Sequence, residues 1–203
     1  LGQQNHRNTH FSCITQFLVL ILHMMSANYY YYIQSAFSKR FCDDVVNYCL
    51  SQNDSLGITG KFNENLNLAD TVQLKTHRNS NVVWVDEPWI TKEIMAVAQQ
   101  VNSLAGWNYD LSFQEAPQFT KYAPGQFYDW HCDGTNKLNE NGLTRKLSMS
   151  ITLSNPEDYT DGLFQFDFRD YDPRHRDPRT AERSVTEILP RGSVLFFPSW
   201  VWH

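Results

Sequence analysis

A histidine and an aspartate separated by one residue are the clearest candidates for chemistry in this chain. They lie in the run Trp130-His131-Cys132-Asp133-Gly134. In an extended strand, residues i and i+2 point to the same face, so His131 and Asp133 can reach one metal ion while Cys132 points away. An imidazole and a carboxylate on one face supply two ligands of the facial triad of two histidines and one carboxylate, the kind of site that holds non-haem iron(II).

The third ligand of such a site has to come from a distant segment. His203 is the candidate, because it follows an expected strand at Ser193–Pro198. A lone H-x-D pair is weak evidence, since most histidines bind no metal. The remaining histidines lie in polar or irregular segments without this context; they are His6, His10, His23, His77 and His175. The sequence therefore predicts a metal site formed by His131, Asp133 and His203.

The first half of the chain contains two helical patterns. Ser38 can cap a helix that runs to about Leu50. Apolar residues then recur every three or four positions from Ile90 to Leu104, which indicates an amphipathic helix that begins at Pro88 and ends at Gly106.

After Gly106 the apolar period changes to two, and Trp107–Phe113 is expected to be a strand. The further expected strands are Val82–Val85, Gln118–Tyr122, Phe127–Asp133, Lys146–Ser154, Leu163–Phe168, Ser184–Leu189 and Ser193–Pro198. Many short strands separated by turn residues favour a sandwich or jelly roll. Helices that precede the strands are expected to cover one outer face of a sheet. We predict a mainly β fold with flanking helices.

The expected strand at Lys146–Ser154 has two different faces. Its apolar side chains alternate with polar ones; the apolar residues are Leu147, Met149, Ile151 and Leu153, and the polar ones are Ser148, Ser150 and Thr152. We expect the apolar face to pack on the helices and the polar face to line the pocket or meet solvent. The charged stretch Asp167–Glu187 is interpreted as a solvated loop, with a loop that contacts substrate as the alternative.

Length and composition fit one ordinary domain. The chain has 203 residues and a formal net charge of −5, which argues against a broad nucleic-acid-binding face. Its four cysteines form no C-x-x-C pair, which favours reduced thiols and a cytoplasmic location.

Residues 1–24 are interpreted as a leader outside a domain at 25–203. The apolar run Phe17–Leu22 is too short to span a bilayer, so no membrane association is expected.

Several runs of this sequence resemble the prolyl-4-hydroxylase type of iron(II)- and 2-oxoglutarate-dependent oxygenase, and the bacterial PKHD-type hydroxylases most of all. Phe119–Asp133 resembles the family's Y-x-x-G-x-x-Y-x-x-H-x-D segment, and Lys146–Ser154 its next core strand. Asp161-Gly162-Leu163-Phe164 is similar to a G-G-x-L/F turn, with Asp161 in place of the first glycine. Pro190–His203 resembles the stretch that carries the distal histidine.

This resemblance implies a double-stranded β-helix, the jelly roll of these oxygenases. It implies iron(II), 2-oxoglutarate and dioxygen as cofactor and cosubstrates, with ascorbate as an additional candidate. The implied reaction converts 2-oxoglutarate to succinate and carbon dioxide while a substrate is hydroxylated. Tyr122 matches a tyrosine that hydrogen-bonds 2-oxoglutarate in relatives, and Thr152 falls where relatives place a cosubstrate contact; an ordinary surface role is the alternative for each.

One departure from the family concerns the end of the sequence. Relatives carry a final strand beyond the distal histidine, with a basic residue that pairs with the C5 carboxylate of 2-oxoglutarate. Both are missing after His203, although Arg145 and Lys146 lie near the site in sequence. We expect the 203-residue chain to be an inactive fragment that binds 2-oxoglutarate poorly.

The sequence leaves the substrate open. A prolyl residue in a protein, a free amino acid and another small molecule all fit. Two other functions also fit: a non-catalytic jelly-roll module that binds sugar or protein, and a cupin-like enzyme that uses another metal without 2-oxoglutarate. Dependence on 2-oxoglutarate distinguishes the favoured enzyme from both.

Overall fold

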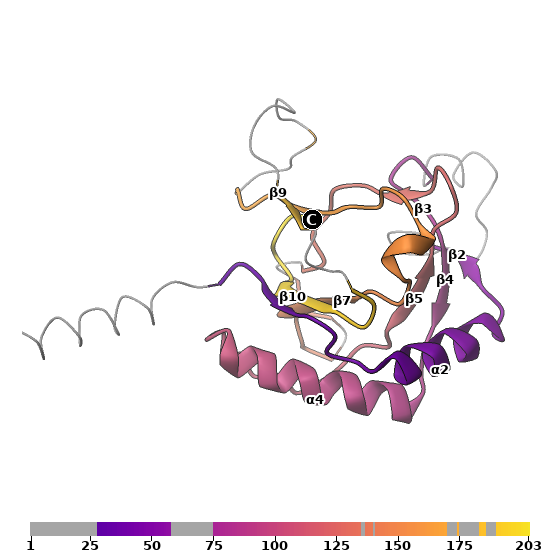
Figure 1. Ribbon diagram of the computed structural model, residues 1–203. Coiled ribbons are helices and arrows are strands. Elements are labelled where there is room, and N and C mark those ends of the chain that lie inside the picture. The colour runs from indigo at the N-terminus through magenta and orange to yellow at the C-terminus, as the bar shows by residue number, and fades with distance from the viewer. Residues whose placement is uncertain are drawn as a thin grey trace, which may run out of the picture.

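The computed structural model describes residues 28–57, 75–134, 137–139, 141–169, 174, 183–185 and 190–203. Figure 1 shows two helices lying beneath strands that are stacked in layers. The expected leader at 1–24 and the end of the expected strand Ser184–Leu189 lie outside the described residues. In the described part of the chain, no helix has the length and apolar character needed to cross a membrane.

The first helix of the described chain, α2, spans Lys39–Leu50. The Ser38 side chain accepts a hydrogen bond from the backbone N–H of Phe41 at 3.1 Å, which satisfies one of the unpaired donors of the first turn. The helix buries Cys42, Val45 and Cys49 on one face. The predicted cap and the predicted end of this helix are both confirmed.

The second helix, α4, spans Pro88–Leu104 and buries Ile90, Ile94 and Val101, as its apolar spacing predicts. Leu104, the last residue of the predicted apolar face, is exposed, because the helix ends there. Gly106 follows at a φ of 75°, the left-handed conformation that commonly ends a helix at glycine.

The prediction of a strand at Trp107–Phe113 is wrong, because the structure has no strand between α4 and Gln118. Asn108 has a φ of 50°, which is incompatible with extended backbone. The buried Asn102 side chain also takes both backbone groups of Tyr109, accepting from its N–H at 3.0 Å and donating to its C=O at 2.8 Å. The alternation of large residues here therefore reflects local packing of an irregular segment.

All strand pairs of the described chain are antiparallel, and most join segments far apart in sequence. The main sheet has the order β1 (Tyr31–Ile33), β10 (Val194–Pro198), β7 (Leu147–Ile151). A second sheet has the order β2 (Ser55–Leu56), β4 (Asn81–Trp84), β5 (Gln118–Lys121). Two separate pairs are β3 (Arg78–Asn79) with β6 (Phe127–Tyr128), and β8 (Phe164–Phe166) with β9 (Arg183–Val185). A short 3-10 helix, η1, spans Pro156–Asp158.

Strand β10 is covered on both faces. Val194 and Phe196 belong to a core cluster shared with α2 and α4, while Leu195 and Phe197 belong to a second cluster with Phe166. The continuous apolar run of this strand is what burial on both faces requires. The helices therefore cover one face of the main sheet, as expected, and the second cluster fills the interior of a jelly roll.

Strand β7 has the two predicted faces. Its apolar residues Leu147, Met149 and Ile151 pack against the helical cluster, and so does Leu153 just beyond the end of the strand. The strand predicted at Phe127–Asp133 is shorter than expected, because β6 ends at Tyr128 and the chain reaches His131 without regular strand geometry.

Candidate metal centre

Two backbone hydrogen bonds join the H-x-D segment to the last residue of the chain. The N–H of His131 donates to the C=O of His203 at 3.0 Å, and the N–H of His203 donates to the C=O of His131 at 3.0 Å. This reciprocal pair is the closely spaced unit of an antiparallel ladder, and it places the two histidines directly opposite each other. The two residues come together through backbone pairing, before any metal is considered.

The segments on either side of this pair are also joined. The Gly134 N–H donates to the Ser199 C=O at 2.7 Å, and the Ser199 hydroxyl donates to the Arg145 C=O at 2.8 Å. A Cβ added at Gly134 would overlap the Ser199 Oγ, so the Ser199 side chain would have to move to accept a larger residue there. The Cys132 thiol points to the Trp200 C=O at 3.2 Å, away from the metal-binding side chains as predicted.

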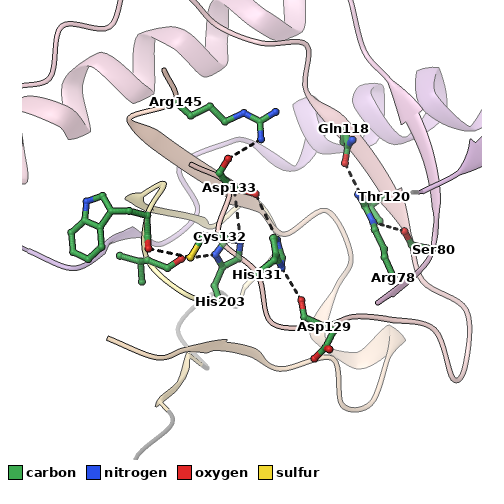
Figure 2. Close-up of polar contacts among 12 residues, drawn as sticks. Arg78, Ser80, Gln118, Thr120, Asp129, His131, Cys132, Asp133, Arg145 and His203 are labelled. Carbon is green, nitrogen blue, oxygen red and sulfur yellow. Dashed lines mark hydrogen bonds and ion pairs between the residues drawn. The ribbon is translucent and has the colours of Figure 1, made fainter. Parts of the chain in front are cut away.

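The three predicted ligand side chains converge on one point, as Figure 2 shows. Nε2 of His131 lies 3.6 Å from Oδ1 of Asp133, and Nε2 of His203 lies 3.7 Å from Oδ2. All three ligand atoms lie within 4.8 Å of one another. Ligand atoms around one octahedral ion are about 3 Å apart, so small side-chain rotations would let one ion contact all three.

Hydrogen bonds fix the tautomer of both histidines. Nδ1 of His131 lies 2.8 Å from the Asp129 C=O, and Nδ1 of His203 lies 2.9 Å from the Val201 C=O. A carbonyl oxygen only accepts, so each Nδ1 carries the hydrogen and each Nε2 keeps its lone pair. The two lone pairs and the carboxylate form a donor set that fits a divalent metal ion such as iron(II).

Burial keeps the imidazoles neutral. Desolvation is the main cause that lowers the pKa of His131 to about 4, and the nearby His203 lowers it further while Asp133 opposes the change. Desolvation likewise lowers the pKa of His203, with Asp133 again opposing. Their side chains are only 20% and 7% exposed. Both rings are thus in the protonation state that binds metal at neutral pH.

A second layer of contacts supports His131. The Tyr128 ring stacks on it, with ring centroids 3.6 Å apart and planes 13° from parallel. The Arg78 guanidinium carbon lies 4.4 Å from the Tyr128 ring centroid. Desolvation raises the pKa of Tyr128 to about 12, so its hydroxyl stays protonated. Sequence reasoning missed Arg78, because the pairing of β3 with β6 that brings it opposite Tyr128 leaves no local pattern.

Arg145 supports the carboxylate ligand. Its Nη1 donates to the Asp133 C=O at 3.1 Å, and its guanidinium pairs with Glu115 at 2.5 Å. Arg145, one of the two basic residues near the site in sequence, therefore binds the backbone of Asp133 and the Glu115 carboxylate.

The two residues predicted to contact the cosubstrate lie at strand ends. Tyr122 follows β5, is 52% exposed, and has a pKa that desolvation raises and the neighbouring Arg78 lowers. Thr152 follows β7, and its backbone pairs with Ser193 and Gly192. Their contacts with a cosubstrate remain predictions.

Comparison with known proteins agrees with this site. The family model described as the 2OG-Fe(II) oxygenase superfamily matches residues 117–203, the part of the chain that holds the converging side chains. No curated protein matches the chain.

Two solved structures show the same fold. A prolyl-4-hydroxylase from Pseudomonas putida superposes with a TM-score of 0.56 at 17% identity, over 92% of this chain and 90% of that one. The viral collagen prolyl hydroxylase of Paramecium Bursaria Chlorella virus-1, in complex with 2-oxoglutarate, superposes with a TM-score of 0.53 at 20% identity, over 84% of this chain and 78% of that one.

Members of this superfamily use iron(II), 2-oxoglutarate and dioxygen, and a metal-ligand set of the required type is present here. The two alternatives of a non-catalytic module and a cupin-like enzyme without 2-oxoglutarate are not favoured. Residues 117–203 are thus similar to the 2OG-Fe(II) oxygenase superfamily, the match supports a 2-oxoglutarate-dependent oxygenase, and the fold is that of the prolyl-4-hydroxylases of known structure.

Proposed function

We propose that this protein hydroxylates a C–H bond of its substrate and that His131, Asp133 and His203 hold the iron(II). The observation that supports the assignment is the convergence of these three ligand atoms within 4.8 Å. When bound, iron(II) and 2-oxoglutarate supply the oxidising chemistry: dioxygen gives one oxygen atom to the substrate and one to succinate, and carbon dioxide is released.

The chain's own residues prepare the site for this reaction. The Asp129 and Val201 carbonyls hold the two imidazoles with Nε2 directed at the shared point. A metal ion held by these three side chains would keep positions free for the 2-oxo acid and dioxygen. Phe164 and Phe197 pack against the His203 ring, with centroids 5.5 Å and 4.5 Å away, and form an apolar wall that limits the access of water.

A peptidyl proline is the first substrate to test. The reason is the names of the two proteins that share the fold, since both are prolyl hydroxylases. Their identity to this chain is low, so free amino acids are tested alongside proline-containing peptides.

The test combines binding with turnover and uses the full-length protein. Anaerobic iron(II) followed by 2-oxoglutarate should produce the charge-transfer absorbance of the chelate, and exposure to air with a substrate should release succinate. The Asp133→Ala variant should lose both signals. A wild-type protein that binds iron(II) but shows neither the absorbance nor succinate release would contradict the proposal.

A further inference from the structure

His131 is the less enclosed of the two imidazoles in the metal centre. Its side chain is 20% exposed, against 7% for His203. Strand β6 ends at Tyr128, so regular strand geometry does not extend to His131. Its Nδ1 bonds the Asp129 C=O at 2.8 Å. A single hydrogen bond at Nδ1 fixes the direction of that nitrogen but lets the ring plane tilt, so a further contact has to set the plane.

The Tyr128 ring supplies this contact. Its centroid lies 3.6 Å from that of His131, and the two planes are 13° from parallel. A parallel ring at van der Waals distance blocks the imidazole from tilting toward it. The face of an aromatic ring also carries negative potential, which attracts the partial positive charge that an imidazole gains on binding a cation. The stack therefore favours the orientation in which Nε2 of His131 is directed at Asp133.

The Arg78 guanidinium lies against the same tyrosine. Its central carbon is 4.4 Å from the Tyr128 ring centroid, and the two residues are direct partners across the β3–β6 pair. Groups at 3.6 Å and 4.4 Å cannot share one face of a ring, so the imidazole and the guanidinium lie on opposite faces. The Tyr128 ring is thus held between an arginine and a metal ligand.

Three hydrogen bonds fix the guanidinium in this position. Arg78 is only 5% exposed. Its Nε donates to Ser80 Oγ at 2.9 Å, and its Nη2 donates to Gln118 Oε1 at 3.1 Å and Thr120 Oγ1 at 3.4 Å, as Figure 2 shows. Gln118 and Thr120 lie on β5. The second sheet therefore anchors Arg78, and Arg78 in turn supports the Tyr128 ring.

The charge of Arg78 has no carboxylate partner in the described part of the chain, because all three of its acceptors are neutral. A buried charge is costly unless an opposite charge accompanies it. Arg191 and Arg169 follow that rule, pairing with Asp43 at 2.7 Å and Asp167 at 2.5 Å. For Arg78 the electrostatic partner is the negative face of an aromatic ring, a contact that a neutral side chain cannot make.

We propose that Tyr128 and Arg78 are positioning residues for iron(II) binding. Tyr128 sets the plane of the His131 imidazole, and Arg78 acts through Tyr128 by holding its ring from the opposite face. The proposal rests on the proposed function, because it takes His131 as an iron(II) ligand. Without the stack, the imidazole takes other orientations in the metal-free protein. Iron(II) affinity then falls by the fraction of molecules in which the ligands still converge.

The first experiment changes the ring in the full-length protein under anaerobic conditions. Tyr128→Leu removes the aromatic face and should weaken iron(II) binding by about ten- to a hundredfold. Tyr128→Phe keeps the face and should bind iron(II) nearly as the wild type does. Cobalt(II) serves as a spectroscopic substitute, because its d–d absorbance depends on ligand geometry. This absorbance should change in Tyr128→Leu and be retained in Tyr128→Phe. Tyr159→Leu is the matched control, since Tyr159 is a partly exposed tyrosine that follows η1, and it should change neither reading.

The second experiment asks whether Arg78 acts through the ring. Arg78→Gln should weaken iron(II) binding by about two- to thirtyfold, the range that corresponds to a cation–π contact. Arg78→Lys should retain part of the affinity, because an ammonium group also binds a ring face. Combined with Tyr128→Leu, Arg78→Gln should have no further effect, since the ring through which it acts is gone. Arg191→Gln is the matched control, because it removes another guanidinium of low exposure and should leave iron(II) affinity unchanged.

Thermal unfolding of the metal-free variants separates positioning from folding. If Arg78→Gln does not fold, Tyr128→Leu still tests the stack, because it leaves the three hydrogen bonds of Arg78 in place. The proposal is overturned if Tyr128→Leu folds, binds iron(II) as the wild type does and keeps the cobalt(II) spectrum. It is also overturned if Arg78→Gln weakens binding equally with and without Tyr128→Leu. A wild type that binds neither iron(II) nor cobalt(II) would instead overturn the proposed function.

Discussion

At the scale of single residues, substitutions at neighbouring positions of the H-x-D segment should have very different effects on iron(II) binding. His131→Ala or Asp133→Ala should reduce iron(II) affinity to background, because each removes one of three ligand atoms that converge on one point. Cys132→Ala should have little effect, because its thiol points to the Trp200 carbonyl. Titration calorimetry with iron(II) under argon measures all three variants. A Cys132→Ala protein without iron(II) binding would show that the orientation of this segment is wrong.

The protonation of His131 gives the metal-free protein a specific pH dependence. Its pKa is about 4 in the folded state and 6.5 as the reference value, so between these values the unfolded chain binds a proton that the folded protein does not. Stability is therefore complete above pH 6.5 and falls as the pH drops toward 4, by at most about 3–4 kcal/mol for this group, since one pKa unit corresponds to about 1.4 kcal/mol.

Urea unfolding at several pH values, with a chelator present, measures this slope. The His131→Gln variant serves as the comparison and should show a shallower loss of stability over the same interval. Equal slopes in the two proteins would mean that folding does not lower the pKa of His131.

The sequence was sufficient to predict the three converging residues but not the groups around them. His131 and Asp133 are two positions apart, so their common direction follows from almost any extended backbone, and it survives although β6 ends at Tyr128. Arg78 reaches the site only because β3 pairs with β6. A pairing between segments fifty residues apart depends on the whole fold, and no periodicity near Arg78 predicts it.

At the scale of elements, Gly192 joins a strand to a helix. The backbone N–H of Phe37, just before α2, donates to the Gly192 C=O at 3.0 Å, and a Cβ at Gly192 would overlap the Phe37 carbonyl oxygen. Its φ of 84° adds left-handed strain for any other residue. Gly192→Ala should therefore destabilise the protein by roughly 3 kcal/mol or more, because strain and steric overlap add.

Gly142→Ala is the matched control, because Gly142 has a φ of 72° but no atom near the position of a Cβ. It should cost only the left-handed strain, about 1–2 kcal/mol. Chemical denaturation compares the two variants. If they lose the same stability, the close approach of Phe37 to Gly192 is unimportant.

Helices were predicted more accurately than strands. The spacing of apolar residues and the Ser38 cap determine α2 and α4 within the helix itself. The alternation at Trp107–Phe113 led to a wrong prediction of a strand. The Asn102 side chain forms hydrogen bonds with the backbone N–H and C=O of Tyr109, and no strand pairs there. Strand formation needs a partner, so local alternation alone is insufficient evidence.

At the scale of the whole molecule, the metal site connects segments that are distant along the chain. Phe197 on β10 belongs to the interior cluster and also packs on His203, which lies opposite the H-x-D segment. An ion that binds all three ligands therefore stabilises the folded protein as a whole. Adding manganese(II), as a redox-inactive substitute for iron(II), should raise the melting temperature of the wild type in proportion to the logarithm of its concentration.

The Asp133→Ala variant should show no such rise, and differential scanning fluorimetry measures both proteins. An equal rise in the variant would place the stabilising ion elsewhere in the molecule.

The reciprocal backbone bonds between His131 and His203 also have a kinetic consequence. Because two backbone hydrogen bonds of 3.0 Å already hold His131 and His203 opposite each other, an arriving ion meets two ligand residues in place, and only small side-chain rotations remain. Loading should then be limited by the loss of water from the ion and not by rearrangement of the chain. Hydrogen–deuterium exchange can follow this in the metal-free protein: the two amides should be protected to the same degree and should open together, since each one's acceptor is the other's residue.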